Sequence, residues 1–315
     1  MGTEAPLAFI ALAPLVGALV TVMNGVNSRF SSSVGNLVST LVIHIAGLAA
    51  VSVLLAAGRE SARPGKAPFY FYLGGLVGVG TVFSCNYTFA ALGASLAVTL
   101  SLLGQTLFSV AADASGFLGR KKYPLSARSL PGIGLAVAGV AVMAGDRRSD
   151  AAAMLVALAS GALPSLSFIL NSELGRRKGI VRSTRVNYLV GLGTTLVVVA
   201  AVRPPAAEAL RAVAAAGPFL ALGGGLMGVA IVAATNLIFP RIPAFSATLL
   251  LFSGQAFAGV AIDFLAAGAF DARKVIGALL LLAGLAINAL LARKLEGKPI
   301  ARPFSRRPSS RSPRP

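Results

Sequence analysis

The sequence predicts an all-α, polytopic membrane protein of about ten transmembrane helices, arranged as two inverted five-helix repeats. Three observations support this fold class: a strongly apolar composition, apolar runs long enough to span a bilayer, and a second half that resembles the first. Of the 315 residues, 56% are hydrophobic and 12% are charged. A typical soluble domain has roughly 25% charged residues. The chain therefore has too few polar groups to cover a water-exposed surface.

The apolar runs are close to 20 residues long, the length at which a helix crosses about 30 Å of hydrocarbon. Backbone groups in lipid must hydrogen bond within their own segment, which favours helices over open sheet. The first run is not preceded by a basic region, so we interpret it as a retained helix rather than a signal peptide. The expected spans are 7–27, 35–56, 70–91, 93–112, 129–145, 151–171, 183–202, 218–239, 244–265 and 273–292.

An internal duplication is the clearest pattern in the chain. At an offset of 150, residues 74–113 are identical to residues 224–263 at 16 of 40 positions. An offset of 144 aligns the segments before them, and the pairs that recur are Gly17 with Gly161, Asn27 with Asn171, Gly35 with Gly179 and Gly47 with Gly191. Biased composition alone would give about one match in ten. We therefore expect a first repeat over 1–148, a second over 149–295, and a disordered basic tail over 296–315.

The basic residues lie between the apolar runs and in the tail, so the net charge of +18 does not indicate nucleic-acid binding. With the N-terminus in the cytoplasm, 21 of the 28 Lys and Arg residues fall on the inner side, as the positive-inside rule requires. Five spans per repeat place the second repeat upside down relative to the first. We expect a bacterial inner-membrane protein with both termini in the cytoplasm and the tail near anionic lipid headgroups.

Several chemistries are disfavoured by what the chain lacks. Cys85 is the single cysteine, which excludes an intramolecular disulfide, and one His with one Cys excludes the usual zinc sites. No G-x-x-x-x-G-K-[ST] loop is present, so direct ATP use is not expected. We expect no cofactor and no bound metal. A membrane-embedded enzyme is disfavoured because the single His has no nearby acidic pair.

The repeated motif is G-A-L…N-S…S-T followed by G-G-L-x-G…N…G-Q-x7-D. It resembles the YdcZ-like branch of the bacterial drug/metabolite transporter superfamily, over about residues 7–292. Members of that branch occur as single five-span units or as fused pairs, and this chain resembles a fused pair. The resemblance implies a ten-helix inner-membrane carrier without specifying its substrate. Small multidrug-resistance pumps, which are distant relatives, place a Glu in the first helix. Neither the first span nor its copy has an acidic residue at mid-depth, which argues against their proton/drug antiport mechanism.

Polar side chains within apolar spans are costly and therefore mark candidate functional residues. Their alternative role is hydrogen bonding between packed helices. Gln105 and Gln255 are expected near mid-depth, where carriers bind substrate at the repeat interface. An amide both donates and accepts hydrogen bonds, so this pair can hold a polar substrate. Asn86 and Asn236, nearer opposite faces, are further candidate substrate-binding residues.

His44 and its repeat partner Tyr188 complete the candidate substrate-binding set. His44 is either a proton carrier that titrates near neutral pH or a neutral, hydrogen-bonded ring within the bundle. The sequence leaves these two roles open.

Two further pairs are candidate gate or coupling residues. Asp113 and Asp263 lie eight residues beyond each Gln, about 12 Å along a helix. As gates they would pair with basic loops, Asp113 with Arg182 or Arg185 and Asp263 with Arg29, and otherwise they are solvated helix-end charges. Asn27 and Asn171 are expected at helix ends, where capping is the favoured role.

The sequence therefore favours a secondary transporter that moves a small polar or amphipathic metabolite or drug by alternating access, with the two halves rocking about a central site. A non-transporting membrane partner subunit or a channel is the main alternative. The partners expected are a small-molecule substrate and the lipid bilayer, and assembly as a homodimer is left open.

Overall fold

The computed structural model describes residues 4–58, 60, 66–115, 130–145, 150–238 and 244–296. Within these ranges the chain forms helices and no strand. The helices are α1 (Glu4–Val34), α2 (Asn36–Ala57), the 3-10 helix η1 (Phe69–Leu73), α3 (Gly74–Leu92), α4 (Ala94–Ser115), α5 (Leu130–Ala144), α6 (Ala151–Ser160), α7 (Ala162–Lys178), α8 (Ile180–Val202), α9 (Ala206–Ala216), α10 (Pro218–Ile238), α11 (Ala244–Ala267) and α12 (Ala272–Glu296).

The helices confirm the all-α membrane fold that the sequence predicts. Within the described residues, eight helical segments are long and apolar enough to cross a membrane, and α5 is a shorter apolar helix. The spanning segments are Ala8–Val34, Asn36–Ala57, Phe69–Leu92, Ala94–Ala112, Ala151–Lys178, Ile180–Val202, Pro218–Thr235 and Ala247–Ala267. The helix α9, between α8 and α10, was not predicted. It has no buried residue, and it packs on α1 and α10.

The first helix of each repeat is longer than predicted. Helix α1 continues to Val34, and α7 continues to Lys178. Each ends at a single glycine, Gly35 or Gly179, with φ of 84° and 101°. Glycine adopts such positive φ values without steric cost. One residue therefore suffices to separate the first and second helices of each repeat.

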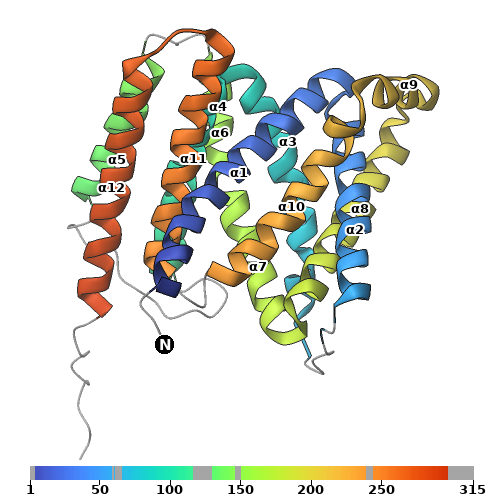
Figure 1. Cartoon of the computed structure of the whole chain (residues 1–315), viewed down its shortest axis with the longest axis horizontal. Coiled ribbons are helices and arrows are strands. Elements are labelled where there is room, and N and C mark those ends of the chain that lie inside the picture. The colour runs from blue at the N-terminus through green and yellow to red at the C-terminus, as the bar shows by residue number, and fades with distance from the viewer. Residues whose placement is uncertain are drawn as a thin grey trace, which may run out of the picture.

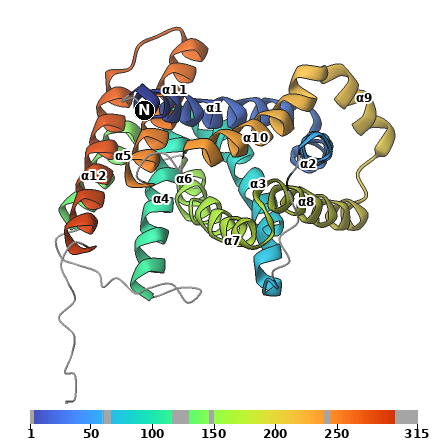
Figure 2. The same cartoon turned by 60° about the horizontal axis from the view of Figure 1, so that its bottom comes forward.

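Equivalent helices of the two repeats pack against each other in antiparallel pairs: α2 with α8, α4 with α11, and α5 with α12. Facing glycines show this direction in the last pair, where Gly132 meets Gly284 and Gly139 meets Gly277. Antiparallel packing of equivalent helices requires a two-fold axis across the helices, which is the geometry of inverted repeats. Figures 1 and 2 show α5 and α12 side by side at one end of the molecule and α2 and α8 at the other.

Helices from different repeats also form very close backbone contacts, each present twice. A Cβ on Gly17 of α1 would collide with the carbonyl of Leu251 on α11, and a Cβ on its counterpart Gly161 would collide with the carbonyl of Ser101 on α4. Small residues allow such close approach in membrane bundles. The largest buried apolar cluster brings together α4, α5, α6, α11 and α12. The predicted repeat boundary at 148–149 and the tail beyond Glu296 lie outside the described residues.

Candidate functional site

Gln105 and Gln255 lie on α4 and α11, the antiparallel pair at the centre of the fold, and both side chains are half-buried. The Gln105 amide donates to Ser101 Oγ at 3.4 Å. The backbone carbonyl of Gln255 accepts a hydrogen bond from Thr21 Oγ1 (3.0 Å), and that of Gln105 accepts one from Ser165 Oγ (3.5 Å). The backbone at each glutamine therefore contacts the first helix of the opposite repeat.

The glycine before each glutamine has a clear packing role. A Cβ on Gly104 would collide with the carbonyl of Leu158, and one on Gly254 with the carbonyl of Pro14. These glycines let α4 approach α6, and α11 approach α1, at backbone contact. Whether the two glutamine side chains share one cavity stays a prediction.

Asn27 and Asn171 lie inside α1 and α7, not at helix ends, so the predicted capping role is wrong. The sequence placed the helix ends too early, because Gly35 and Gly179 terminate these helices instead. Asn27 packs on Gly224 of α10, and Asn171 packs on Gly74 of α3. Both asparagines thus join the first helix of one repeat to the third helix of the other.

The two asparagines differ in their hydrogen bonds. Asn171 Nδ2 donates to Ser167 Oγ (3.1 Å) and to Asn187 Oδ1 (3.0 Å). Asn27 is 4% exposed, and its Oδ1 has no hydrogen-bond partner among the described residues. The residue equivalent to Asn187 is Ile43, so the first repeat has no counterpart of the bond from Asn171 to Asn187.

Asn86 on α3 is 2% exposed and belongs to a second amide pair. Its Nδ2 donates to Asn36 Oδ1 at 2.9 Å, and its backbone carbonyl accepts a hydrogen bond from Ser28 Oγ of α1 at 2.9 Å. Asn36 in turn donates to the carbonyl of Phe83 at 3.0 Å. These contacts join the C-terminal parts of α1 and α3. The side chain of Asn236, the counterpart of Asn86, lies outside the described part of the chain.

Sequence reasoning missed Asn36 and Asn187. Neither belongs to the repeated motif, because their repeat equivalents are Ile180 and Ile43. The available signal was their chemistry alone, since an asparagine within an apolar span needs a partner.

His44 and Tyr188 meet between α2 and α8, with ring centroids 6.0 Å apart and planes inclined by 69°. The His44 ring fits against Gly191, and the Tyr188 ring fits against Gly47. His44 Nδ1 lies 2.7 Å from the carbonyl of Thr40, one turn earlier on its own helix. The structure thus places both rings on the pseudo-two-fold axis within a tight helix–helix contact.

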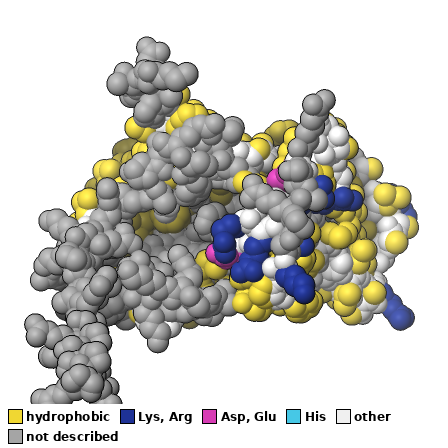
Figure 3. Space-filling view, turned by 90° about the horizontal axis from the view of Figure 1, so that it is seen from below, with side chains coloured by type: hydrophobic (Ala, Val, Ile, Leu, Met, Phe, Trp, Pro, Cys, Tyr) yellow, Lys and Arg dark blue, Asp and Glu magenta, His cyan; other side chains and the backbone are white. Residues whose placement is uncertain are grey.

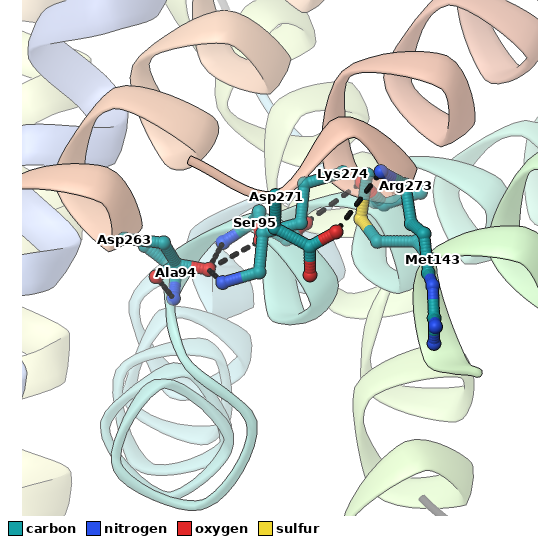
Figure 4. A network of polar contacts seen from close by, with 8 residues as sticks. Ala94, Ser95, Met143, Asp263, Asp271, Arg273 and Lys274 are labelled. Atoms are coloured by element: carbon teal, nitrogen blue, oxygen red, sulfur yellow. Dashed lines mark hydrogen bonds and ion pairs between the residues drawn. The ribbon is translucent and has the colours of Figure 1, made fainter. Parts of the chain in front are cut away.

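Among the described carboxylates, Asp263 accepts the most hydrogen bonds, and only 8% of the residue is exposed (Figure 4). It accepts hydrogen bonds from the backbone N–H groups of Ala94 (2.8 Å) and Ser95 (3.2 Å) and from the Ser95 hydroxyl. It also forms an ion pair with Lys274 Nζ of α12 at 2.8 Å. A carboxylate at a helix N-terminus satisfies free N–H groups and the helix dipole.

This arrangement differs from the pairing expected for Asp263. The partner is Lys274, which lies 11 residues further along the chain, whereas Arg29 is exposed and takes no part in the network. Lys274 reaches Asp263 because the turn between α11 and α12 brings it back to the end of α11. The side chain of Asp113, the repeat counterpart of Asp263, lies outside the described residues. Within the described ranges, no group of three or more His, Cys, Asp or Glu residues is arranged to hold a metal ion.

Comparisons with known proteins agree with the repeat architecture. The family model described as "Putative inner membrane exporter, YdcZ" matches residues 8–142 and again residues 152–287. A solved structure described as "Crystal structure of protein" superimposes with a TM-score of 0.54 at 21% sequence identity, covering 93% of this chain and 100% of that chain, which supports the fold alone. A search of curated proteins found no match. Because the family model matches twice and covers most of the chain, the protein belongs to the YdcZ family of multi-pass inner-membrane transporters, in a form that joins two repeats.

Proposed function

We propose that the protein is a secondary transporter that exports a small polar or amphipathic molecule by alternating access. The observation that carries this proposal is an asymmetry between equivalent helix pairs. Helix α1 packs along α3, with Ser28 hydrogen bonded to the carbonyl of Asn86. No comparable packing joins the equivalent helices α7 and α10 within the described part of the chain.

A bundle with exact two-fold symmetry would pack both pairs or neither. In this proposal, the end at α1 and α3 is the closed end, and the end at α7 and α10 is the open end. Inverted-repeat carriers alternate between two such states, in which the repeats exchange their conformations. A static scaffold does not need a difference in packing between its two ends.

The close backbone contacts indicate which helices move together. Helix α1 is held against α10 and α11, through Gly224 and Gly254 among others, and α6 and α7 are held against α3 and α4 through Gly74 and Gly104. Contacts this tight resist sliding. Each moving body in this proposal takes helices from both repeats, which refines the rocking of one half against the other that the sequence suggested.

The polar groups on α4, α11 and the helices packed against them favour a ligand held by hydrogen bonds. The polar side chains described there include amides and hydroxyls: Thr21, Ser101, Gln105, Ser165 and Gln255. Such groups bind neutral or zwitterionic polar groups without a fixed counter-charge. The family description, "Putative inner membrane exporter", supports export as the direction.

The open end carries Arg176, Arg177 and Lys178 at the end of α7, and the positive-inside rule favours a cytoplasmic location for such a basic end. We therefore propose that both termini are cytoplasmic and that this conformation accepts cargo from the inside. A C-terminal reporter active only in the cytoplasm tests the orientation, and a periplasmic C-terminus would reverse it.

Disulfide cross-linking in proteoliposomes tests alternating access. In a Cys85→Ser background, Ser28→Cys with Asn86→Cys joins α1 to α3 across the two bodies at the closed end, where Ser28 Oγ lies 2.9 Å from the backbone carbonyl oxygen of Asn86. The matched control, Val26→Cys with Gly223→Cys, joins α1 to α10 within one body, at 3.6 Å between the added Cβ and Val26 Cγ1.

Oxidation should stop exchange of a labelled substrate in the first variant, reduction should restore it, and the control should exchange substrate in both states. A screen with polar metabolites and cationic drugs, with and without a pH gradient, identifies the substrate to use. Equal flux through the oxidised and reduced forms of the first variant would exclude alternating access, and flux that does not saturate would indicate a channel.

A further inference from the structure

The end of α7 and the start of α8 form a corner rich in basic side chains, which we term the basic corner. Three basic residues make up the last turn of α7, and two more lie in the first two turns of α8. The basic corner consists of Lys66, Arg176, Arg177, Lys178, Arg182 and Arg185. Figure 3 shows Lys and Arg side chains gathered on this lower face, beside apolar surface and with few acidic side chains.

Two carboxylates lie at the basic corner, and both are engaged. Glu60 accepts hydrogen bonds from the backbone N–H groups at the start of α8: Ile180 at 2.7 Å, Val181 at 3.2 Å and Arg182 at 3.0 Å. Its negative charge therefore lies on a helix N-terminus. Glu173 pairs with Arg176 at 2.8 Å. The described part of the corner thus keeps a surplus of positive charge.

Two of the arginines are fixed in place and still have an unsatisfied donor. Arg177 donates to the carbonyl of Lys66 at 3.1 Å, and its guanidinium lies 5.2 Å from the centre of the Phe71 ring. Arg182 donates to the carbonyl of Glu60 at 3.3 Å. The Nε–H groups of Arg177 and Arg182 are buried and have no acceptor among the described residues. Buried donors normally have partners, so both groups lack the acceptor that such donors usually have.

The neighbouring helix η1 indicates the source of that acceptor. Phe69 is 77% exposed and Tyr70 is 43% exposed, directly beside the basic residues. Aromatic rings next to basic residues mark the level of lipid headgroups. Anionic headgroups attract basic side chains that lie close to the membrane surface. A phospholipid supplies both an anionic phosphate for the arginines and an apolar part for the rings.

We propose that the basic corner binds the phosphate headgroup of an anionic membrane lipid, with the acyl chains over the exposed rings of η1. The site rests on membrane location alone and is independent of the proposed transport function. Arginine guanidinium groups hold phosphate oxygens through paired hydrogen bonds, so Arg177 and Arg182 supply oriented donors, and Lys66, Lys178 and Arg185 supply charge.

The test is native mass spectrometry of the full chain in detergent with added phosphatidylglycerol or phosphatidylcholine. The variant Lys66→Gln/Lys178→Gln/Arg185→Gln removes three charges for which the structure shows no hydrogen bond to another side chain. The matched control is Arg29→Gln/Arg203→Gln/Arg211→Gln, three exposed bases at the opposite end of the molecule. A charge-conserving variant, Lys66→Arg/Lys178→Arg/Arg185→Lys, separates loss of charge from loss of fold.

The unmodified protein and the control should bind phosphatidylglycerol more tightly than phosphatidylcholine. The triple Gln variant should bind it on the order of 100-fold more weakly, since each basic residue near an anionic surface contributes about fivefold. The charge-conserving variant should bind normally. Equal affinity for both lipids, or equal weakening in the control, would overturn the proposal. Displacement of the lipid by inorganic phosphate at equal concentration would indicate a site for free anions instead.

Discussion

The two ends of this bundle are built from equivalent helices, yet they pack differently. At one end α1 lies against α3, and Asp263 joins α11 to the start of α4 and to α12. At the other end no comparable packing joins α7 and α10 within the described residues, and a carboxylate from outside the repeat motif, Glu60, caps α8. The duplication therefore produced two similar sets of helices, and individual side chains determine how the helices pack at each end.

The contacts common to both halves should be the most sensitive to change. Gly254→Ala and Gly104→Ala each place a methyl group on a backbone carbonyl that cannot move away. We expect each to destabilise the protein by about 3 kcal/mol, the upper range for overpacking, with thermal unfolding in detergent as the measurement. The control is Gly134→Ala, where nothing lies within 4 Å of the added Cβ. Normal stability of both variants would show that these contacts do not hold the bodies together.

The carboxylates at the two ends should differ in importance. Asp263→Ala removes a buried ion pair and a helix cap and leaves Lys274 unpaired. We expect it to lower the free energy of unfolding by about 3 kcal/mol. Glu60→Ala removes a more exposed cap and should lower the free energy of unfolding by about 1 kcal/mol. Comparison of the two unfolding midpoints measures the difference. If Glu60→Ala is the more damaging, the end near α7 and α8 is the better fixed of the two.

Gln105 of α4 and Gln255 of α11 should contribute equally to substrate affinity. Loss of one hydrogen bond to a ligand costs about 1 kcal/mol, so the Gln105→Ala/Gln255→Ala double variant should bind its substrate roughly tenfold more weakly or worse. Binding of the substrate to purified protein measures this, and Thr106→Ala on the same helix is a control. Unchanged affinity in the double variant would assign both amides to packing.

The smallest expected effect concerns the closed end itself. Ser28→Ala removes the hydrogen bond from α1 to the carbonyl of Asn86, worth about 1 kcal/mol, and should shift the population about fivefold towards opening at this end. A cysteine placed beside it on α3, in a Cys85→Ser background, should then react faster with a water-soluble maleimide. Ser32→Ala serves as the control, because Ser32 bonds only within its own helix, to Ser28. An unchanged labelling rate would place the closure elsewhere.

The membrane-spanning helices could be predicted from the sequence, because the hydrophobicity of a short segment is enough to indicate each one. The apolar runs, their number and the duplicated Gly, Asn and Gln residues predicted the helical membrane fold, and the family match agrees. Helix ends were less predictable. Apolarity fades gradually near the membrane surface, so the ends of α1 and α7 were placed too early, although Gly35 and Gly179 were both recognised as repeated.

The sequence by itself determined that this chain crosses a membrane as two inverted repeats, since hydrophobicity, length and repetition are properties of short segments. Only the tertiary structure decided which side chains meet. Asn171 bonds to Asn187, which has no polar counterpart in the first repeat, and Asp263 bonds to residues 168 and 169 positions away as well as to Lys274. Such contacts depend on helix rotation and depth, and these are set by the close glycine contacts between helices distant in the chain.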